Sequence, residues 1–449
     1  MIPRRRGANF AIVPRHVEPF PRPCNSPDDP KHPLPGPAGS RAGTDRALMR
    51  LAIVRQDYRP EGVVERSTEP ALEAMLERNV AISLYTRSWP QTRLQLIEPA
   101  IIDPFHVGAL WRDRGFARAA CRAVRRWQPS LVESHERLLC CDLYRAADGV
   151  HAVWLEERVK RAAASGRIAV RLSPHNRYLL RIERRLYASP WLRAVICGSA
   201  MVREEIRSRF CVPDSKLHTI YNPVDSEFFH PGLRAQRATI TARLGIDAAA
   251  TIYLVAAADF ARAGVGTAID AIAQLPPPVH LVVVGEDSDP ARYRRRAQAR
   301  GAGDRVTFVG RTTDTRPYHG AADVFVLASL YDPSPDSTLE AMACALPVIT
   351  STKAGAAELV REYNCGLVCP SGDVAALADH MRALQEPSAR AGFAANARRA
   401  VLPLSPAAIT LQQVLLYRDL LAAPAPARGR VETLPDACAS APDRLRDPR

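Results

Sequence analysis

The chain has 449 residues, of which 47% are hydrophobic and 24% charged, and its formal net charge is +14. This length exceeds the ~250–300 residues at which single cores usually divide, so two folded domains are expected. The composition is that of a globular protein, which excludes a fully disordered chain. No apolar run approaches the ~20 residues that span a bilayer. The arginines near the N-terminus are not followed by an apolar segment, so no secretory signal is predicted.

The two ends of the chain are rich in proline and lack apolar periodicity. Residues 1–48 and 423–449 cannot bury enough surface to offset the entropy of ordering them, so both are predicted to be disordered tails. Met49 lies just before a strand-like run, which favours a start there. Ten scattered cysteines form no paired framework, which predicts reduced thiols and a cytoplasmic location.

The positive charge is concentrated in one part of the chain. Residues 49–220 carry 29 Lys and Arg against 19 Asp and Glu, which gives +10, whereas residues 221–449 carry 24 of each. A basic face suits an anionic membrane surface or a phosphorylated acceptor, although a solvated arginine-rich surface explains it as simply. No aromatic-basic recognition motif is present, so nucleic acid is not an expected partner.

From residue 49 onwards, strand and helix signals alternate twice. In the first half we expect strands at 51–55, 81–86, 131–134 and 192–198, with helices at 70–78, 115–127, 151–164, 178–188 and 200–209. In the second half we expect strands at 251–256, 280–284, 306–309, 324–327 and 348–350, with helices at 265–274, 291–300, 338–344 and 406–421. Asn222-Pro223 and Pro231 break regular structure between the halves.

This alternation is typical of open parallel sheets covered on both faces. The predicted fold is α/β, with two doubly wound, Rossmann-like domains that face each other across a cleft. The domains are expected at 49–222 and 223–405. Residues 406–422 would form a C-terminal helix that packs back on the first domain.

Ligands of such sheets bind at the carboxyl ends of the strands, where three loops stand out. One follows the first strand and contains Gly62. A second contains Arg262 and Gly264 and opens a helix. A helix N-terminus and a guanidinium suit a diphosphate, but an ordinary surface arginine is the simple alternative.

The third loop carries the most specific signal. Asp332 and Glu340 lie eight positions apart and bracket a loop that enters a helix. Glu340 can accept both hydroxyls of a ribose, and Asp332 can accept hydroxyls of a sugar. The donor-binding residues expected between them, whose amides would face phosphate, are Ser334, Asp336, Ser337, Thr338 and Leu339. Without context, Glu340 is equally a plain acid near a helix start.

Over residues 50–402 the sequence resembles the retaining GT-B glycosyltransferases of family 4, and within them the lipopolysaccharide core glucosyltransferase I group. The family's Glu-x7-Glu loop matches 332–340, its Phe-x-Arg-Lys-Gly loop 260–264, its Gly-Gly turn 62–63 and its Leu-Asp-x-Tyr-x-Ala-Ala-Asp segment 141–148. The resemblance implies that Gly62, Val63, Arg262 and Gly264 approach the diphosphate. It also implies that Asp142 lies near the anomeric carbon and that Asp142 and Arg262 serve catalysis.

The chain departs from the family pattern at the diphosphate. Ala263 replaces the family's lysine, and Val63 replaces the second glycine of the turn. Asp332 is one methylene shorter than the family's first glutamate. Loss of the lysine removes positive charge where a diphosphate departs.

The resemblance implies transfer of a hexose, with retention, from UDP-glucose to an anionic lipid-linked saccharide such as lipopolysaccharide core. No cofactor and no metal are expected. The basic first domain would contact the membrane surface, so the location implied is the cytoplasm and the inner face of the cytoplasmic membrane. Two alternatives remain open, which are a catalytically weakened or inactive homologue and a sugar-nucleotide epimerase of the same fold.

Overall fold

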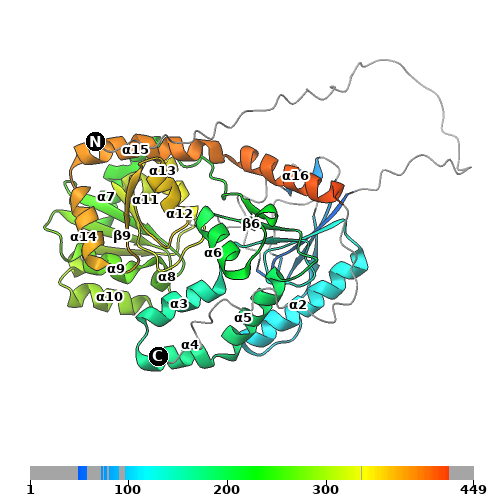
Figure 1. Cartoon of the computed structure of the whole chain (residues 1–449). Coiled ribbons are helices and arrows are strands. Elements are labelled where there is room, and N and C mark those ends of the chain that lie inside the picture. The colour runs from blue at the N-terminus through cyan, green and yellow to red at the C-terminus, as the bar shows by residue number, and fades with distance from the viewer. Residues whose placement is uncertain are drawn as a thin grey trace, which may run out of the picture. The chain divides into compact units, whose positions relative to one another are not determined.

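The computed structural model describes residues 49–57, 72–73, 75–77, 80–89, 97–334 and 336–423. Within these residues the first half of the chain forms a seven-stranded sheet of order β3-β2-β1-β4-β5-β6-β7, here called the first sheet (Figure 1). Its strands are β1 (Arg50–Val54), β2 (Ala81–Thr86), β3 (Glu98–Ile101), β4 (Leu131–Ser134), β5 (Leu143–Arg145), β6 (Ala194–Cys197) and β7 (Leu217–Thr219). All its strand pairs are parallel.

The second half forms a six-stranded parallel sheet of order β10-β9-β8-β11-β12-β13, here called the second sheet. Its strands are β8 (Thr251–Ala256), β9 (Val279–Val284), β10 (Val306–Gly310), β11 (Val324–Leu327), β12 (Val348–Ser351) and β13 (Gly366–Cys369). In both sheets the strand order reverses beside the first strand, as in doubly wound folds. The α/β class predicted from the alternation of signals is therefore confirmed.

Helices cover the faces of both sheets (Figure 1). Those of the first half are α2 (Gly108–Trp127), α3 (His151–Arg161), α4 (Ala164–Leu172), α5 (Pro174–Tyr187) and α6 (Ala200–Phe210). Those of the second half are α7 (Arg237–Leu244), α8 (Phe260–Ala263), α9 (Val265–Ile272), α10 (Pro290–Ala299), α11 (Arg316–Ala321), α12 (Asp336–Ala343), α13 (Ala357–Glu362), α14 (Val374–Ala383), α15 (Pro387–Val401) and α16 (Pro406–Ala422). The helix expected at 70–78 lies largely outside the described residues.

Local chemistry explains where α5 begins. A helix was expected only from residue 178, but α5 starts four residues earlier at Pro174. The Ser173 hydroxyl accepts a hydrogen bond from the Asn176 amide, and proline at the first helical position needs no amide partner. The capping pair therefore extends the helix towards α4.

Helix α16 contacts the first sheet after leaving the second (Figure 1). The Tyr417 hydroxyl donates to the carboxylate of Glu133 on β4, which is 2% exposed. Arg145 on β5 donates its Nε to the same carboxylate at 3.0 Å. Since an uncompensated buried charge is costly, this network fixes the helix against the sheet.

Side-chain hydrogen bonds link the two halves of the chain, among them those of Tyr331 and Glu358. Tyr331 lies in the loop after β11. Its hydroxyl donates to Glu205 Oε2 at 2.8 Å and accepts from the Val150 amide at 2.8 Å. The Glu358 carboxylate on α13 accepts from the amides of Ala200 and Met201 at 2.7 and 3.0 Å. A carboxylate at the first turn of α6 is favoured by the helix dipole.

The expectation that all the thiols are reduced is wrong, because Cys121, Cys140 and Cys211 are disulfide-bonded. Cys121 on α2 and Cys140, which precedes β5, form a disulfide with their Cα atoms 5.8 Å apart. Their separation of 19 residues in sequence gave no signal, because the pair meets only when α2 packs over the sheet.

No single helix among the described residues is long and apolar enough to cross a membrane. One pair, Pro387–Leu404 with Pro406–Ala422, meets that test of length and composition together and is bent by 41°.

Candidate functional site

A cavity of about 960 Å³ lies at the carboxyl ends of β8, β9, β10 and β11. Its volume is near the upper end of the ~300–1,000 Å³ typical of small-molecule sites. The first sheet contributes Ala147 and Asp148, which follow β5. This is the edge at which open α/β sheets bind ligands.

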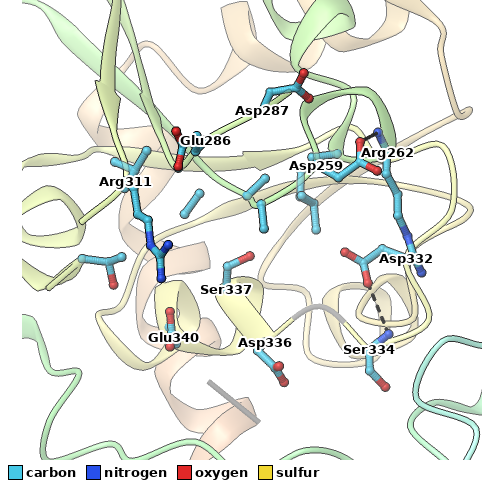
Figure 2. A pocket seen from close by; sticks show the side chains of 18 of the residues that line it. Asp259, Arg262, Glu286, Asp287, Arg311, Asp332, Ser334, Asp336, Ser337 and Glu340 are labelled. Atoms are coloured by element: carbon cyan, nitrogen blue, oxygen red, sulfur yellow. Dashed lines mark hydrogen bonds between the residues drawn. The ribbon is translucent and has the colours of Figure 1, made fainter. Parts of the chain in front are cut away.

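Helix α12 and the loop before it line one side of the cavity with residues that the sequence predicted: Asp332, Ser334, Asp336, Ser337 and Glu340. Glu340 is 4% exposed, and Figure 2 shows its carboxylate directed towards Arg311. The carboxylate of Asp336 accepts a hydrogen bond from the Asn222 amide group at 2.6 Å. Two predicted residues, Thr338 and Leu339, are buried and do not line the cavity.

Asp332 lies at the other end of the cavity, beside Arg262 (Figure 2). Its carboxylate accepts a hydrogen bond from the Ser334 amide at 3.4 Å. Burial raises the pKa of Asp332, while the positive charge of Arg262 and the Ser334 hydrogen bond oppose the rise. The two ends of the predicted loop therefore face one cavity, with acid at both ends.

Arg262 is held in place by three groups. The Asp259 carboxylate caps α8 by accepting from the Arg262 amide at 2.9 Å. The guanidinium donates through Nε to the Tyr331 carbonyl at 2.8 Å, and it lies 5.6 Å from the ring centre of Trp154 on α3. A guanidinium fixed in this way can bind a diphosphate with little loss of entropy.

Gly264, which was expected to approach the diphosphate, does not itself line the cavity. It has φ +76°, and a Cβ there would lie 2.0 Å from the carbonyl oxygen of Ala328, just after β11. The neighbouring Arg262 carbonyl accepts from the Leu330 amide at 2.8 Å. Gly264 therefore lets the α8–α9 junction pack closely on the β11 loop and so helps to place Arg262.

The first amide of α8 is also not available to a phosphate. The Phe260 amide donates to Asp287 Oδ2 at 3.0 Å. Ala263, at the position of the family's lysine, is 6% exposed and lines the cavity with a methyl group.

The structure does not bring Asp142 to the cavity. It precedes β5, at the amino end of the strand, where its carboxylate accepts from the Val132 amide at 2.9 Å. It is 4% exposed, so its observed role is to hold the backbone of β4. Asp148, the last residue of the same motif, follows the carboxyl end of β5 and does line the cavity.

Sequence reasoning missed the loops after β9 and β10. The loop after β9 contributes Glu286 and Asp287 to the cavity, and the loop after β10 contributes Arg311. Their signal in the sequence was a glycine at the end of a strand of the parallel sheet, Gly285 before Glu286 and Gly310 before Arg311. Gly62 and Val63 lie outside the described residues. Among the residues that are described, no group of three or more His, Cys, Asp or Glu side chains could hold a metal ion.

Comparison with known families divides the chain at the same place as its two sheets. Residues 64–228 match the model "Glycosyltransferase Family 4", and residues 236–400 match "Glycosyl transferases group 1".

Among sequence relatives, the lipopolysaccharide core biosynthesis glycosyltransferase LpsE of Rhizobium meliloti is 35% identical over 112 residues, which are 25% of this chain and only 33% of LpsE. The lipopolysaccharide glucosyltransferase WaaG of Escherichia coli is 22% identical over 337 residues, covering 71% of this chain and 85% of WaaG.

Solved structures share the fold. The crystal structure of WaaG superimposes with a TM-score of 0.71 at 20% identity, covering 83% of this chain and all of that one. HepE of Anabaena, solved with UDP-glucose, gives 0.64 at 18% identity with 83% and 100% coverage. With both halves matched by glycosyltransferase models and the two-sheet fold shared with WaaG, this chain belongs to the GT-B glycosyltransferases of family 4 and is related to the lipopolysaccharide core type.

Proposed function

We propose that this chain transfers a hexose from a nucleotide diphosphate sugar, UDP-glucose being the first candidate, to a lipid-linked saccharide with retention of anomeric configuration. One observation carries the proposal. Glu340 at one end and Arg262 with Asp332 at the other face a single cavity large enough for a nucleotide sugar (Figure 2). Glu340 would accept the ribose hydroxyls, Arg262 would bind the diphosphate, and Asp332 would accept hydroxyls of the hexose.

In this reaction the bond between the anomeric carbon and the diphosphate oxygen breaks, and a bond to an acceptor hydroxyl oxygen forms. The proton of the acceptor hydroxyl passes to the departing diphosphate oxygen, which keeps the electron pair of the broken bond, and UDP leaves. The residues' part is to bind and orient the donor and to offset the charge that grows on the diphosphate. Arg262 and Arg311 are the cations in the cavity lining that can do so, and we propose that no metal is needed.

We further propose that the first half of the chain contacts an anionic lipid surface at the inner face of the membrane, where a lipid-linked acceptor would lie. Three large apolar side chains near the start of α2 are exposed, Phe105 by 88%, Val107 by 66% and Trp111 by 59%. Helix α2 also carries Arg112, Arg114, Arg118, Arg122, Arg125 and Arg126 against the single acid Asp113. Exposed apolar side chains next to basic residues suit a membrane with anionic headgroups. Each basic residue near that surface contributes ~1 kcal/mol to the binding free energy.

Changing Phe105 and Trp111 together to glutamate should reduce binding to phosphatidylglycerol vesicles by about tenfold or more, because two apolar anchors become anions. Co-sedimentation with vesicles measures the effect. Leu411→Glu, which changes a 55% exposed leucine on α16, is the control. Equal loss in the control, or equal binding to neutral phosphatidylcholine, would contradict this docking surface.

Ala263 favours a second candidate, a weakened donor-binding homologue. The family's lysine would supply a cation beside the diphosphate, and Ala263 places a methyl group in the cavity lining instead.

Ala263→Lys should therefore raise donor affinity or UDP release by about tenfold, equivalent to ~1.4 kcal/mol. Calorimetric titration with UDP-glucose and an assay of released UDP measure the two effects. Release of UDP also separates a transferase from an epimerase, which keeps its nucleotide sugar whole.

The matched control is Ala261→Lys, which adds the same charge to an exposed position of α8 that does not line the cavity. If both lysine variants behave alike, Ala263 is not the position of a lost phosphate contact. If Ala263→Lys alone gains, the rest of the donor site is intact.

A further inference from the structure

Two aromatic rings, one from each half of the chain, lie beside the guanidinium of Arg262. Its central carbon is 5.6 Å from the ring centre of Trp154 on α3 and 5.9 Å from that of Tyr331, in the loop after β11. Its Nε also donates to the Tyr331 carbonyl at 2.8 Å. A guanidinium is attracted to the faces of aromatic rings, so the position of this one depends on where both rings are held.

The side chain of Tyr331 connects this loop to the start of α3. Tyr331 is fully buried, and its hydroxyl accepts from the Val150 amide and donates to Glu205 on α6, each at 2.8 Å. Val150 immediately precedes α3, and the Trp154 amide one turn later donates to the Val150 carbonyl at 3.1 Å. A Cβ on Gly149 would lie only 2.2 Å from the Tyr331 hydroxyl oxygen, so glycine leaves the hydroxyl its place. The hydroxyl therefore fixes the end of α3 that carries Trp154.

Both partners of the Tyr331 hydroxyl are costly to leave unpaired. Val150 is fully buried, so its amide has no ready replacement partner. Burial raises the pKa of Glu205, while the hydrogen bond from Tyr331 and the charge of Lys353, whose Nζ lies 3.6 Å from Glu205 Oε1, oppose the rise. Without the hydroxyl, these groups stay buried and unpaired or move towards water, and the start of α3 moves with the Val150 amide.

We propose that Tyr331 is a positioning residue that acts through Arg262. Its carbonyl and ring hold the guanidinium from one half of the chain, and its hydroxyl holds α3 so that Trp154 meets the guanidinium from the other. The first half thereby sets the diphosphate contact of the second.

This inference rests on the proposed function, in which Arg262 binds the diphosphate of the donor. Arg262 lies with Asp332 at the end of the cavity away from Glu340, the proposed ribose ligand (Figure 2). The outer phosphate of UDP is therefore the one that the guanidinium would meet. Tyr331 should matter for binding of UDP and little for binding of UMP, which lacks that phosphate.

Tyr331→Phe removes the hydroxyl and keeps both the ring and the carbonyl. In the full chain, we expect it to weaken UDP binding about tenfold and to leave UMP affinity within about twofold of the wild type, as measured by calorimetric titration. A variant that only loosened the fold would weaken both nucleotides alike. The ratio of the two dissociation constants therefore reports the position of Arg262.

Tyr253→Phe is the matched control, because it removes the same atom from another fully buried tyrosine. The Tyr253 hydroxyl donates to the Met381 carbonyl at 2.6 Å, and Tyr253 does not line the cavity. Its replacement should lower the melting temperature through the lost hydrogen bond. Both nucleotide affinities should stay within about twofold of the wild type.

Trp154→Leu tests the same route if Tyr331→Phe folds poorly. It keeps both hydrogen bonds of the Tyr331 hydroxyl and removes only the ring beside Arg262. We expect UDP binding to weaken about fivefold and UMP binding by less than about twofold. In the double variant the two losses should not add, since both act through one guanidinium.

The inference is overturned if Tyr331→Phe and Trp154→Leu keep the wild-type ratio of UDP to UMP affinity, or if Tyr253→Phe changes that ratio as much. Titration of the wild type separates this failure from that of the proposed function. If the wild type binds UDP no more tightly than UMP, Arg262 does not meet the outer phosphate and both proposals fail. If the wild type prefers UDP and the variants keep that preference, the inference alone falls.

Discussion

Replacing Glu340 with alanine should weaken binding of UDP-glucose by about 10- to 100-fold, because a hydrogen bond to a charged acceptor contributes ~1.5–3 kcal/mol. Glu340 is 4% exposed and lines the large cavity. Its carboxylate is therefore held where a bound ribose can donate to it. Calorimetric titration of the wild type and the variant gives the two dissociation constants.

Glu362→Ala is the control for this prediction. Glu362 ends α13, is exposed and does not line the cavity, so its loss should leave donor affinity within about twofold. Glu340→Gln keeps the size of the side chain and should fall between wild type and alanine. A change of less than about threefold in Glu340→Ala would mean that the ribose binds elsewhere.

Gly264→Ala should strongly destabilise the protein and disturb the site. The left-handed φ of +76° costs an alanine ~1–2 kcal/mol. A Cβ only 2.0 Å from the Ala328 carbonyl oxygen forces the backbone apart, at a further ~1–3 kcal/mol. At ~2–4 °C for each kcal/mol, we expect the melting temperature to fall by roughly 4–20 °C. Donor affinity should fall as well, since Arg262 belongs to the same turn.

Gly245→Ala separates backbone strain from overlap. Gly245 has a similar φ of +65°, but a Cβ there meets no atom within 4 Å. Its replacement should lower the melting temperature by only about 2–8 °C and leave donor affinity unchanged. Equal effects of the two alanines on melting and on UDP-glucose binding would show that the contact with Ala328 does not position Arg262.

Much of the fold followed from local pattern. Short Val, Ile and Leu runs alternating with helices are buried on both faces only in parallel sheets, and both sheets have this form. The missed strands are the weak cases. β5 has three residues and ends in Arg145, and that arginine is tolerated in the sheet because Glu133 on β4 accepts from it at 3.0 Å. The carboxylate that neutralises this arginine comes from a neighbouring strand. The strand propensity of residues 143–145 alone therefore cannot predict β5.

The sequence by itself predicted that Asp332 and Glu340 would bind one ligand from the two ends of a loop that enters a helix, and both residues line one cavity. Only the tertiary structure decided the rest of the lining. Arg311 and Asp287 join the cavity because parallel strands bring their carboxyl ends to one edge, whatever the separation in sequence. Asp142 and Asp148 belong to one motif, yet three strand residues place them at opposite ends of β5. At 3.3 Å a residue, that strand carries only the later carboxylate to the edge where ligands bind.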